Sequence, residues 1–291
     1  MGAMEAGAEE GSPRLRESEL TVPKVMSDAA RRLAAVSDTP RLDAELLLAH
    51  ACGLSRERLL LAPPRGAPPQ DFEVLLERRL AHEPVAYIVG HRAFWTIDLA
   101  VGPGVLIPRP DSETLIEAAV EHFGERGPGR VLDLGTGSGA LLLAALAQWP
   151  RATGLGVDTS EAALAVARAN AERLGFADRA TIARGSWEAA ATADFDLILC
   201  NPPYIERGAI LPKDVVDYEP ASALFAGPGG LDEYRRIAPG LRPATGGIAC
   251  VEIGATQAKA VCTLFEAEGL LTQVKRDLGG RDRCIIVSAK A

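Results

Sequence analysis

The sequence predicts an α/β fold, in which a mostly parallel sheet is covered by helices, preceded by a small N-terminal helical bundle. From Arg130 onward, short apolar runs rich in β-branched residues alternate with stretches of helical spacing, which is typical of a parallel sheet. Between Val25 and Ala81 the apolar residues recur only at helical spacing. A chain of 291 residues exceeds the usual ~150 per domain, so two units are expected.

The N-terminal part should consist of a leader and the bundle. Residues 1–23 are rich in Gly, Ala, Glu and Ser, which predicts a disordered leader. Residues 24–83 should form the bundle, interrupted at Thr39-Pro40 and at the proline-rich segment 62–70. Its helices are expected at 25–33, 42–50 and 72–80. Such a bundle can be a packing module, or it can position a partner for the neighbouring domain.

The remainder should form a linker and the α/β domain. Residues 84–110 are rich in β-branched and aromatic residues broken by glycine, which predicts a β-hairpin linker. Residues 111–291 should form the domain itself. Its strands are expected at 131–135, 154–158, 180–185, 195–200, 246–254, 271–277 and 283–289, with helices at 140–149, 161–174 and 256–268. The short Gly-rich turn 278–281 predicts that the last two strands form an antiparallel hairpin.

A glycine-rich loop follows the first strand of this domain. Its residues of interest are Asp133, Gly135, Thr136, Gly137, Ser138 and Gly139. Glycine lets the backbone approach a ligand closely, and the N-terminus of the following helix favours groups that accept hydrogen bonds. The same pattern also occurs in tight turns that serve packing alone. The next strand favours a ligand site, because it ends in an acid that is placed to accept the hydroxyls of a ribose, Asp158.

The identity of this ligand depends on the spacing of the glycines. A dinucleotide fingerprint is G-x-G-x-x-G, whereas this loop has D-x-G-x-G-x-G, which is similar to the first motif of class I S-adenosylmethionine-dependent methyltransferases. We therefore favour S-adenosylmethionine over NAD. In that family the acid of the loop, here Asp133, serves near the amino-acid end of the cofactor. Asp158 could alternatively cap the helix that starts near Glu161, although Thr159 or Ser160 could cap it equally well.

A second motif, Asn201-Pro202-Pro203-Tyr204, follows a predicted strand. The two prolines fix φ near about −65° and lack N–H donors, so the turn is stiff and presents acceptors. The Asn201 side-chain oxygen and the Pro202 carbonyl can accept both N–H groups of a planar amide, and Tyr204 can pack against its face. Catalysis would then consist of alignment and polarisation and would need no metal. The turn could instead merely end the strand, but its place at the edge that carries the glycine loop favours a site.

Several blocks of the chain resemble the HemK/PrmC family, the glutamine methyltransferases that act on class I peptide-chain release factors. The blocks are EPVAYIVGHRAFW, VLIPRPDSE, VLDLGTGSGALLLA, GVDTSEAALAVARANAERLG, GSW, FDLILCNPPYI, YEPASALFAGPGGLDEYRRI and DLGGRDR. They stand in family order and extend from about Val25 to the C-terminus. The family usually has Glu-Thr-Glu where this chain has Asp111-Ser112-Glu113, so the chain departs from the family pattern at this point.

The resemblance implies a class I methyltransferase fold that holds S-adenosylmethionine at residues 135–139, with Asp158 at its ribose and Trp187 beside its adenine. Asn201 is also expected to contact the cofactor. The resemblance further implies that residues 201–204 hold the glutamine of the Gly-Gly-Gln motif of the release factor. It also implies that the bundle helps to dock this partner.

Two other functions remain open from the sequence. An adenine or cytosine amino-methyltransferase would use a similar turn, because these bases present the same planar amino group. The net charge of −8 argues against a nucleic-acid partner, although Arg92 and Arg109 prevent its exclusion. A catalytically silent module that binds a translation factor is the other alternative. The acidic leader and the lack of a long apolar run predict a cytoplasmic protein with no membrane contact, and a monomer is expected.

Overall fold

The structure is a computed structural model that describes residues 21–191 and 195–290. Most of the predicted leader, residues 1–20, lies outside the described residues. Its last residues do not belong to a leader, because helix α1 spans Val22–Leu33 and Val22 is buried. Pro23 is compatible with this start, since the first turn of a helix does not need the N–H that proline lacks.

The chain divides into two compact units between Val89 and Gly90. The first contains α1 and four further helices: α2 (Pro40–Ala51), α3 (Arg56–Leu61), α4 (Asp71–Leu80) and α5 (Val85–Val89). Its core is mostly aliphatic and includes Leu33, Leu47 and Leu76, all at most 1% exposed, together with Phe72. Full burial of such a side chain contributes roughly 1.5–3 kcal/mol.

Helix α5 corrects one prediction. The β-rich composition of residues 84–110 predicted extended structure from its start, yet Val85–Val89 is helical. The Pro84 carbonyl accepts the N–H groups of Tyr87 and Ile88, and Ile88 packs in the core of the bundle. Burial of this side chain therefore outweighs the β-propensity of the segment. Extended structure begins only in the second unit, with the antiparallel hairpin of β1 (His91–Phe94) and β2 (Ile97–Ala100).

The second unit is built on a mostly parallel sheet, as the sequence predicted. In the described residues its order is β5-β4-β3-β6-β7-β9-β8, in which β9 runs antiparallel to both of its neighbours. The strands are β3 (Arg130–Leu134), β4 (Thr153–Asp158), β5 (Ala180–Arg184), β6 (Leu197–Cys200), β7 (Ile248–Glu252), β8 (Leu270–Arg276) and β9 (Asp282–Ala289). The predicted terminal hairpin is thus confirmed. The five parallel strands end at the same edge, which brings the loops after β3, β4, β5 and β6 together.

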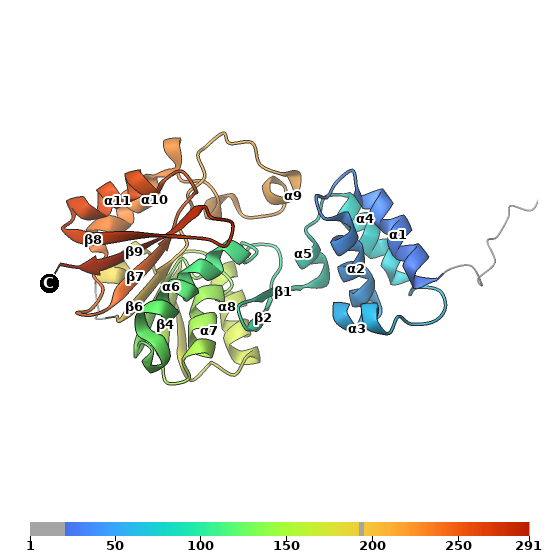
Figure 1. Cartoon of the computed structure of the whole chain (residues 1–291), viewed down its shortest axis with the longest axis horizontal. Coiled ribbons are helices and arrows are strands. Elements are labelled where there is room, and N and C mark those ends of the chain that lie inside the picture. The colour runs from blue at the N-terminus through green and yellow to red at the C-terminus, as the bar shows by residue number, and fades with distance from the viewer. Residues whose placement is uncertain (1–20, 192–194, 291) are drawn as a thin grey trace, which may run out of the picture. The chain divides into compact units, whose positions relative to one another are not determined.

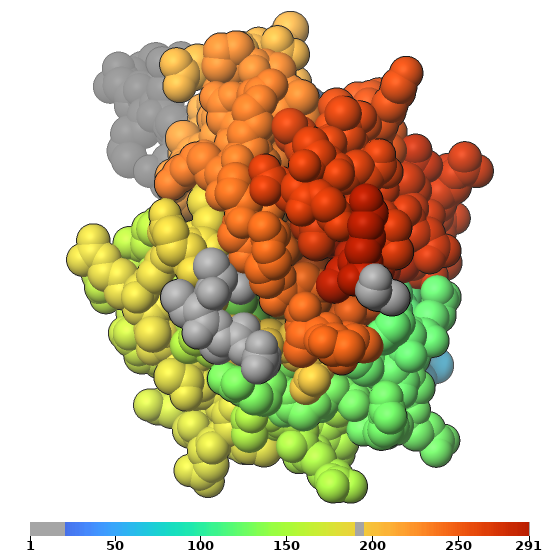
Figure 2. Space-filling model, turned by 90° about the vertical axis from the view of Figure 1, so that its left-hand side faces the viewer, coloured from blue at the N-terminus to red at the C-terminus, as the bar shows by residue number. Residues whose placement is uncertain are grey.

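Helices cover both faces of this sheet (Figure 1). One face carries α6 (Glu113–Phe123), α7 (Ala140–Gln148) and α8 (Glu161–Arg173), and the other carries α10 (Asp232–Ile237) and α11 (Ala258–Ala267). Shorter elements are α9 (Lys213–Val216) and the 3-10 helices η2 (Pro110–Ser112), η3 (Gly124–Arg126), η4 (Trp187–Ala191), η5 (Ala221–Ala223), η6 (Pro228–Gly230) and η7 (Ala238–Gly240). Figure 2 looks onto the edge where the parallel strands begin and β9, in red, ends.

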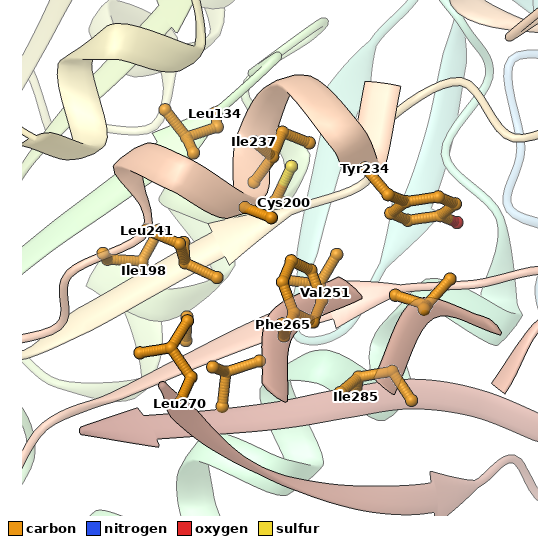
Figure 3. Close-up of a cluster of buried hydrophobic side chains, with 14 of the residues drawn as sticks. Leu134, Ile198, Cys200, Tyr234, Ile237, Leu241, Val251, Phe265, Leu270 and Ile285 are labelled. Atoms are coloured by element: carbon orange, nitrogen blue, oxygen red, sulfur yellow. The ribbon is translucent and has the colours of Figure 1, made fainter. Parts of the chain in front are cut away.

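The core between the sheet and the helices α10 and α11 consists of fully buried side chains. Figure 3 shows Ile198 and Val251 of the central strands facing Phe265 of α11, all of them 0% exposed. Tyr234 of α10 is also fully buried, and its hydroxyl donates to the Glu252 carbonyl (2.9 Å). The carboxyl ends of β6 and β7 are therefore fixed against a rigid layer, on which the candidate site depends.

Candidate cofactor and substrate site

A cavity lies at the edge of the sheet where the parallel strands end. The loops after β3, β4, β5 and β6 line it, together with segments that precede the sheet in the sequence. Eight of the predicted site residues are on its wall: Gly135, Thr136, Gly137, Ser138, Asp158, Trp187, Asn201 and Pro203. Four others lie off the wall: Asp133, Gly139, Pro202 and Tyr204. The structure thus brings the glycine loop and the Asn-Pro-Pro-Tyr turn to one cavity.

The glycine loop is held by strand β4. The N–H groups of Gly135 and Thr136 both donate to the Val157 carbonyl (2.9 Å each). Gly135 has φ +70°, and a Cβ there would stand 3.3 Å from the Trp187 ring. The backbone conformation therefore favours glycine at this position, and the indole leaves little room for a Cβ. The loop presents backbone to the cavity beside the indole.

Asp158 is fixed by two backbone donors. Its Oδ2 accepts the N–H of Gly137 (3.0 Å), and its Oδ1 accepts the N–H of Ser160 (2.9 Å). Ser160 is itself the N-cap of α8, because its hydroxyl accepts the N–H of Ala163 (3.3 Å). The capping role that the sequence left open for Asp158 thus belongs to Ser160. The carboxylate of Asp158 reaches the cavity wall with lone pairs that remain available to hydroxyl groups.

Asp133 lies behind the loop and not on the wall of the cavity. It is 1% exposed, and its Oδ2 accepts the Thr136 hydroxyl (2.6 Å) and the N–H of Leu142 (3.2 Å). Its Oδ1 has no hydrogen-bond partner among the described residues. Burial raises the pKa of Asp133 to about 7. In this structure Asp133 ties the glycine loop to the start of α7, and its expected role near the amino-acid end of the cofactor stays a prediction.

Two side-chain hydrogen bonds anchor the Asn-Pro-Pro-Tyr turn. Asn201 donates from Nδ2 to the Ser112 hydroxyl (3.1 Å), and Tyr204 donates from its hydroxyl to Oε1 of Glu252 (3.1 Å). Burial, followed by the charge of Glu252, raises the pKa of Tyr204, so its hydroxyl remains a donor. Tyr204 thus supports the turn through its hydroxyl, and its packing against the substrate amide stays a prediction.

Trp187 is held by a residue that sequence reasoning did not select. Its indole N–H donates to Oε2 of Glu233 (2.6 Å), which also accepts Nη1 of Arg236 (2.9 Å). All three residues line the cavity. Glu233 and Arg236 stand within the block YEPASALFAGPGGLDEYRRI, so the resemblance marked their segment but not their role.

A buried acid joins two further segments of the wall. Glu219 accepts Nη2 of Arg109 (2.5 Å) through Oε1 and the N–H of Ile107 (3.1 Å) through Oε2. Its side chain is 1% exposed, and burial raises its pKa, although Arg109 opposes this shift. Glu219 thereby joins its own segment to residues 107–109, and Arg109 and Pro220 both line the cavity. The sequence did not predict this pairing, because the two residues are far apart in the chain.

Two further observations concern membrane-spanning helices and metal-binding clusters. None of the helices in residues 21–191 and 195–290 is both long and apolar enough to cross a membrane. Within the same residues, no group of three or more His, Cys, Asp or Glu side chains is arranged to hold a metal ion.

Comparison with known families covers both units. Residues 24–90 match the family described as the PrmC N-terminal domain, and residues 111–217 match the methyltransferase small domain. The second match contains both the glycine loop and the Asn-Pro-Pro-Tyr turn.

Individual relatives align over almost the whole chain. A release factor glutamine methyltransferase of Rhodospirillum rubrum is 44% identical, covering 97% of this chain and 89% of its own length. A protein of the same name from Caulobacter vibrioides is 42% identical over 92% of this chain and 96% of its own length. Among solved structures, the hMettl16 catalytic domain is similar with a TM-score of 0.50 and 16% identity, covering 66% of this chain and 75% of that one, which bears on the fold alone.

Proposed function

Because the chain belongs to the release factor glutamine methyltransferase family, we propose that it transfers a methyl group from S-adenosylmethionine to the side-chain amide nitrogen of the glutamine in the Gly-Gly-Gln motif of class I release factors. It is an enzyme, with the fold of class I methyltransferases. One observation supports the proposal most directly: Asn201 lines the same cavity as the glycine loop and Asp158. An amide-orienting group and a cofactor-binding loop are thereby within reach of one small ligand.

The wall of the cavity fits S-adenosylmethionine. Gly135 leaves space that a Cβ would restrict, next to the indole of Trp187. Asp158 offers carboxylate oxygens to the ribose hydroxyls, and Trp187 offers an apolar ring to the adenine. Thr136 and Ser138 complete the loop around the cofactor. When bound, the cofactor supplies an electrophilic methyl group on a positively charged sulfur.

Asn201 and Pro202 orient the substrate in this proposal. An amide nitrogen is a weak nucleophile, because its lone pair is delocalised into the carbonyl. Asn201 Oδ1 and the Pro202 carbonyl accept its two N–H bonds, which draws electron density onto nitrogen and directs it at the methyl group. Pro203 stiffens the turn, since its φ is fixed. The turn needs no covalent intermediate and no metal for this task.

The N-terminal unit gives the protein substrate a second surface in this proposal. Residues 24–90 match a domain that is named for this family, and the unit has a core of its own. We assign it to docking of the release factor, so that the Gly-Gly-Gln loop can enter the cavity of the second unit. Its removal should therefore affect KM for the release factor far more than KM for the cofactor.

The test is an incubation of the full chain with radiolabelled S-adenosylmethionine and a class I release factor. A twin release factor, in which alanine replaces the glutamine of Gly-Gly-Gln, is the matched control. Label should appear on the release factor and not on the twin. Label on the twin would overturn the assigned target, and label on added RNA or DNA would favour the amino-methyltransferase of nucleic acids. Cofactor binding without turnover on any of these substrates would indicate a silent module.

A further inference from the structure

The wall of the cavity carries a second carboxylate, to which the proposed function assigns no contact with a ligand. Among the described residues that line the cavity, Asp158 and Glu233 are the two carboxylates. Asp158 lies at the end of β4 and is assigned to the ribose, whereas Glu233 belongs to α10. The side chain of Glu233 is 18% exposed, so most of it is removed from water. Burial of a charged group costs free energy unless its oxygens have hydrogen-bond partners.

Helix α10 fixes Glu233 beside the cavity. The next residue, Tyr234, is fully buried, and its hydroxyl donates to the Glu252 carbonyl (2.9 Å). Ile237 is also fully buried, and residues three positions apart lie on the same side of a helix, so this side of α10 packs in the core. Glu233 and Arg236, also three positions apart, share the side that reaches the cavity. Packing of the helix therefore sets the position of the carboxylate.

The hydrogen bonds of Glu233 leave one of its two oxygens able to accept another donor. Oε2 accepts the indole N–H of Trp187 (2.6 Å) and Nη1 of Arg236 (2.9 Å). Among the residues that the structure describes, Oε1 accepts only the same Nη1, at the longer distance of 3.2 Å. A carboxylate oxygen can accept about two hydrogen bonds. Because Glu233 lines the cavity, Oε1 can accept an N–H from a ligand there.

The indole of Trp187 connects this carboxylate to the glycine loop. A Cβ at Gly135 would stand 3.3 Å from Cη2 in the six-membered ring of the indole, whereas Glu233 binds the N–H of the five-membered ring. A purine and an indole are fused rings of similar size, so a purine that stacks on Trp187 has an edge within reach of the carboxylate. Adenine carries a 6-amino group with two N–H donors at one of its edges.

We propose that Glu233 recognises the adenine of the cofactor by accepting an N–H of its 6-amino group through Oε1, and so selects adenine over purines that lack this group. The inference rests on the proposed function, in which the cofactor places its adenine on Trp187. A charged acceptor forms a hydrogen bond about twice as strong as a neutral one. A purine without the amino group removes water from Oε1 and gives no hydrogen bond in return, which is the source of the selection. Arg236 holds the carboxylate in place from its other side.

The test compares two ligands of the full chain by calorimetric titration. One is S-adenosylhomocysteine, and the other is its analogue in which hydrogen replaces the 6-amino group. The original protein should bind the first about tenfold or more tightly than the second. In Glu233→Ala the two affinities should agree within about threefold, because the acceptor is gone. Equal affinity for the two ligands in the original protein overturns the inference.

The same titrations separate recognition of the amino group from support of the indole. If Glu233 acted only by holding Trp187, Glu233→Ala would weaken both ligands by the same factor, and the survival of the preference for the amino group would overturn the inference. Glu233→Gln has the same size but no charge, so it should lower this preference about threefold or more. An unchanged preference in Glu233→Gln also overturns the inference.

Asp232→Ala is the matched control. Asp232 forms the same kind of ion pair with a residue three positions on, Arg235, but it lies off the cavity wall. Its variant should keep the full preference for the amino group. A loss of the preference in Asp232→Ala would overturn the inference, since any change in α10 would then suffice.

The titrations do not require methyl transfer. If the release factor is not methylated while Glu233→Ala loses the preference, the proposed function fails and the inference about the adenine stands. If the release factor is methylated while the preference is absent or survives Glu233→Ala, the inference fails and the proposed function stands. The two failures are thereby distinguishable.

Discussion

Asp158 at the end of β4 accepts the backbone N–H of Gly137 in the glycine loop, with a distance of 3.0 Å between nitrogen and Oδ2. This bond joins the two parts of the predicted cofactor site, which are separated by a helix in the sequence. Asp158 therefore stabilises the glycine loop even without a bound cofactor. A substitution there changes both the ribose contact and the position of the loop.

Asp158→Ala should weaken cofactor binding by about 1–3 kcal/mol, the usual range for hydrogen bonds to a charged group. Calorimetric titration with S-adenosylhomocysteine measures this directly. Ser160→Ala is the control, since it removes the cap of α8 and leaves the carboxylate in place. Equal affinity in the Asp158→Ala variant and the original protein would exclude the ribose contact.

Asn201→Ala should lower methyl transfer by about 100-fold or more while cofactor affinity stays nearly unchanged, because the side chain orients the substrate amide in the reaction. Single-turnover transfer to a release factor gives the rate, and titration gives the affinity. A matched loss of rate and affinity would instead indicate that the turn had collapsed.

Trp187→Ala should weaken cofactor binding, because stacking of a base on an aromatic ring is worth about 1–3 kcal/mol. Trp187→Phe retains a ring but loses the hydrogen bond to Glu233, so the comparison separates stacking from anchoring. Competition against adenosine, measured by fluorescence or calorimetry, checks the adenine assignment. A Trp187→Ala variant that loses affinity for S-adenosylhomocysteine but not for adenosine would contradict it.

Asp133→Asn should alter how stability depends on pH. The pKa of Asp133 is raised to about 7 in the folded chain, so its stabilising contribution is complete below its ordinary pKa and is lost as the pH rises through about 7. Asparagine has no charge to bury. The free energy of unfolding of Asp133→Asn, relative to the original, should therefore increase between pH 4 and about 7 and then level off. Urea unfolding across this range measures it, with the exposed Asp28→Asn as control.

Much of the fold could be predicted, because the sequence patterns that specify it lie within short segments of the chain. The alternation of strands and helices after Arg130 required only apolar periodicity and glycine or proline breaks, and it gave the parallel sheet and its final hairpin. The segment Val85–Val89 was predicted incorrectly, because a tertiary contact there outweighs the local preference. Its β-branched residues favour a strand locally, but burial of Ile88 in the bundle makes it a helix.

The candidate site was predictable in outline only. Asp158 and the glycine loop could be placed at one edge from strand order alone, and Asn201 could be added from its position after a strand. The sequence offered Asp158, Thr159 and Ser160 as caps of α8, and only the structure shows that the Ser160 hydroxyl accepts the N–H of Ala163. No local pattern predicted that Glu233 holds Trp187, that Glu219 pairs with Arg109 or that Ser112 accepts from Asn201.

The sequence by itself determined the elements, the loop that approaches a ligand and the stiff proline turn, since each depends on the conformational limits of adjacent residues. The tertiary structure alone decided that Asp133 is enclosed, that Glu219 holds Arg109, and that Glu252 supports the turn through Tyr204. These contacts join residues far apart in the chain. They form only when packing of the sheet and its helices brings the side chains within hydrogen-bond distance and removes water from around them.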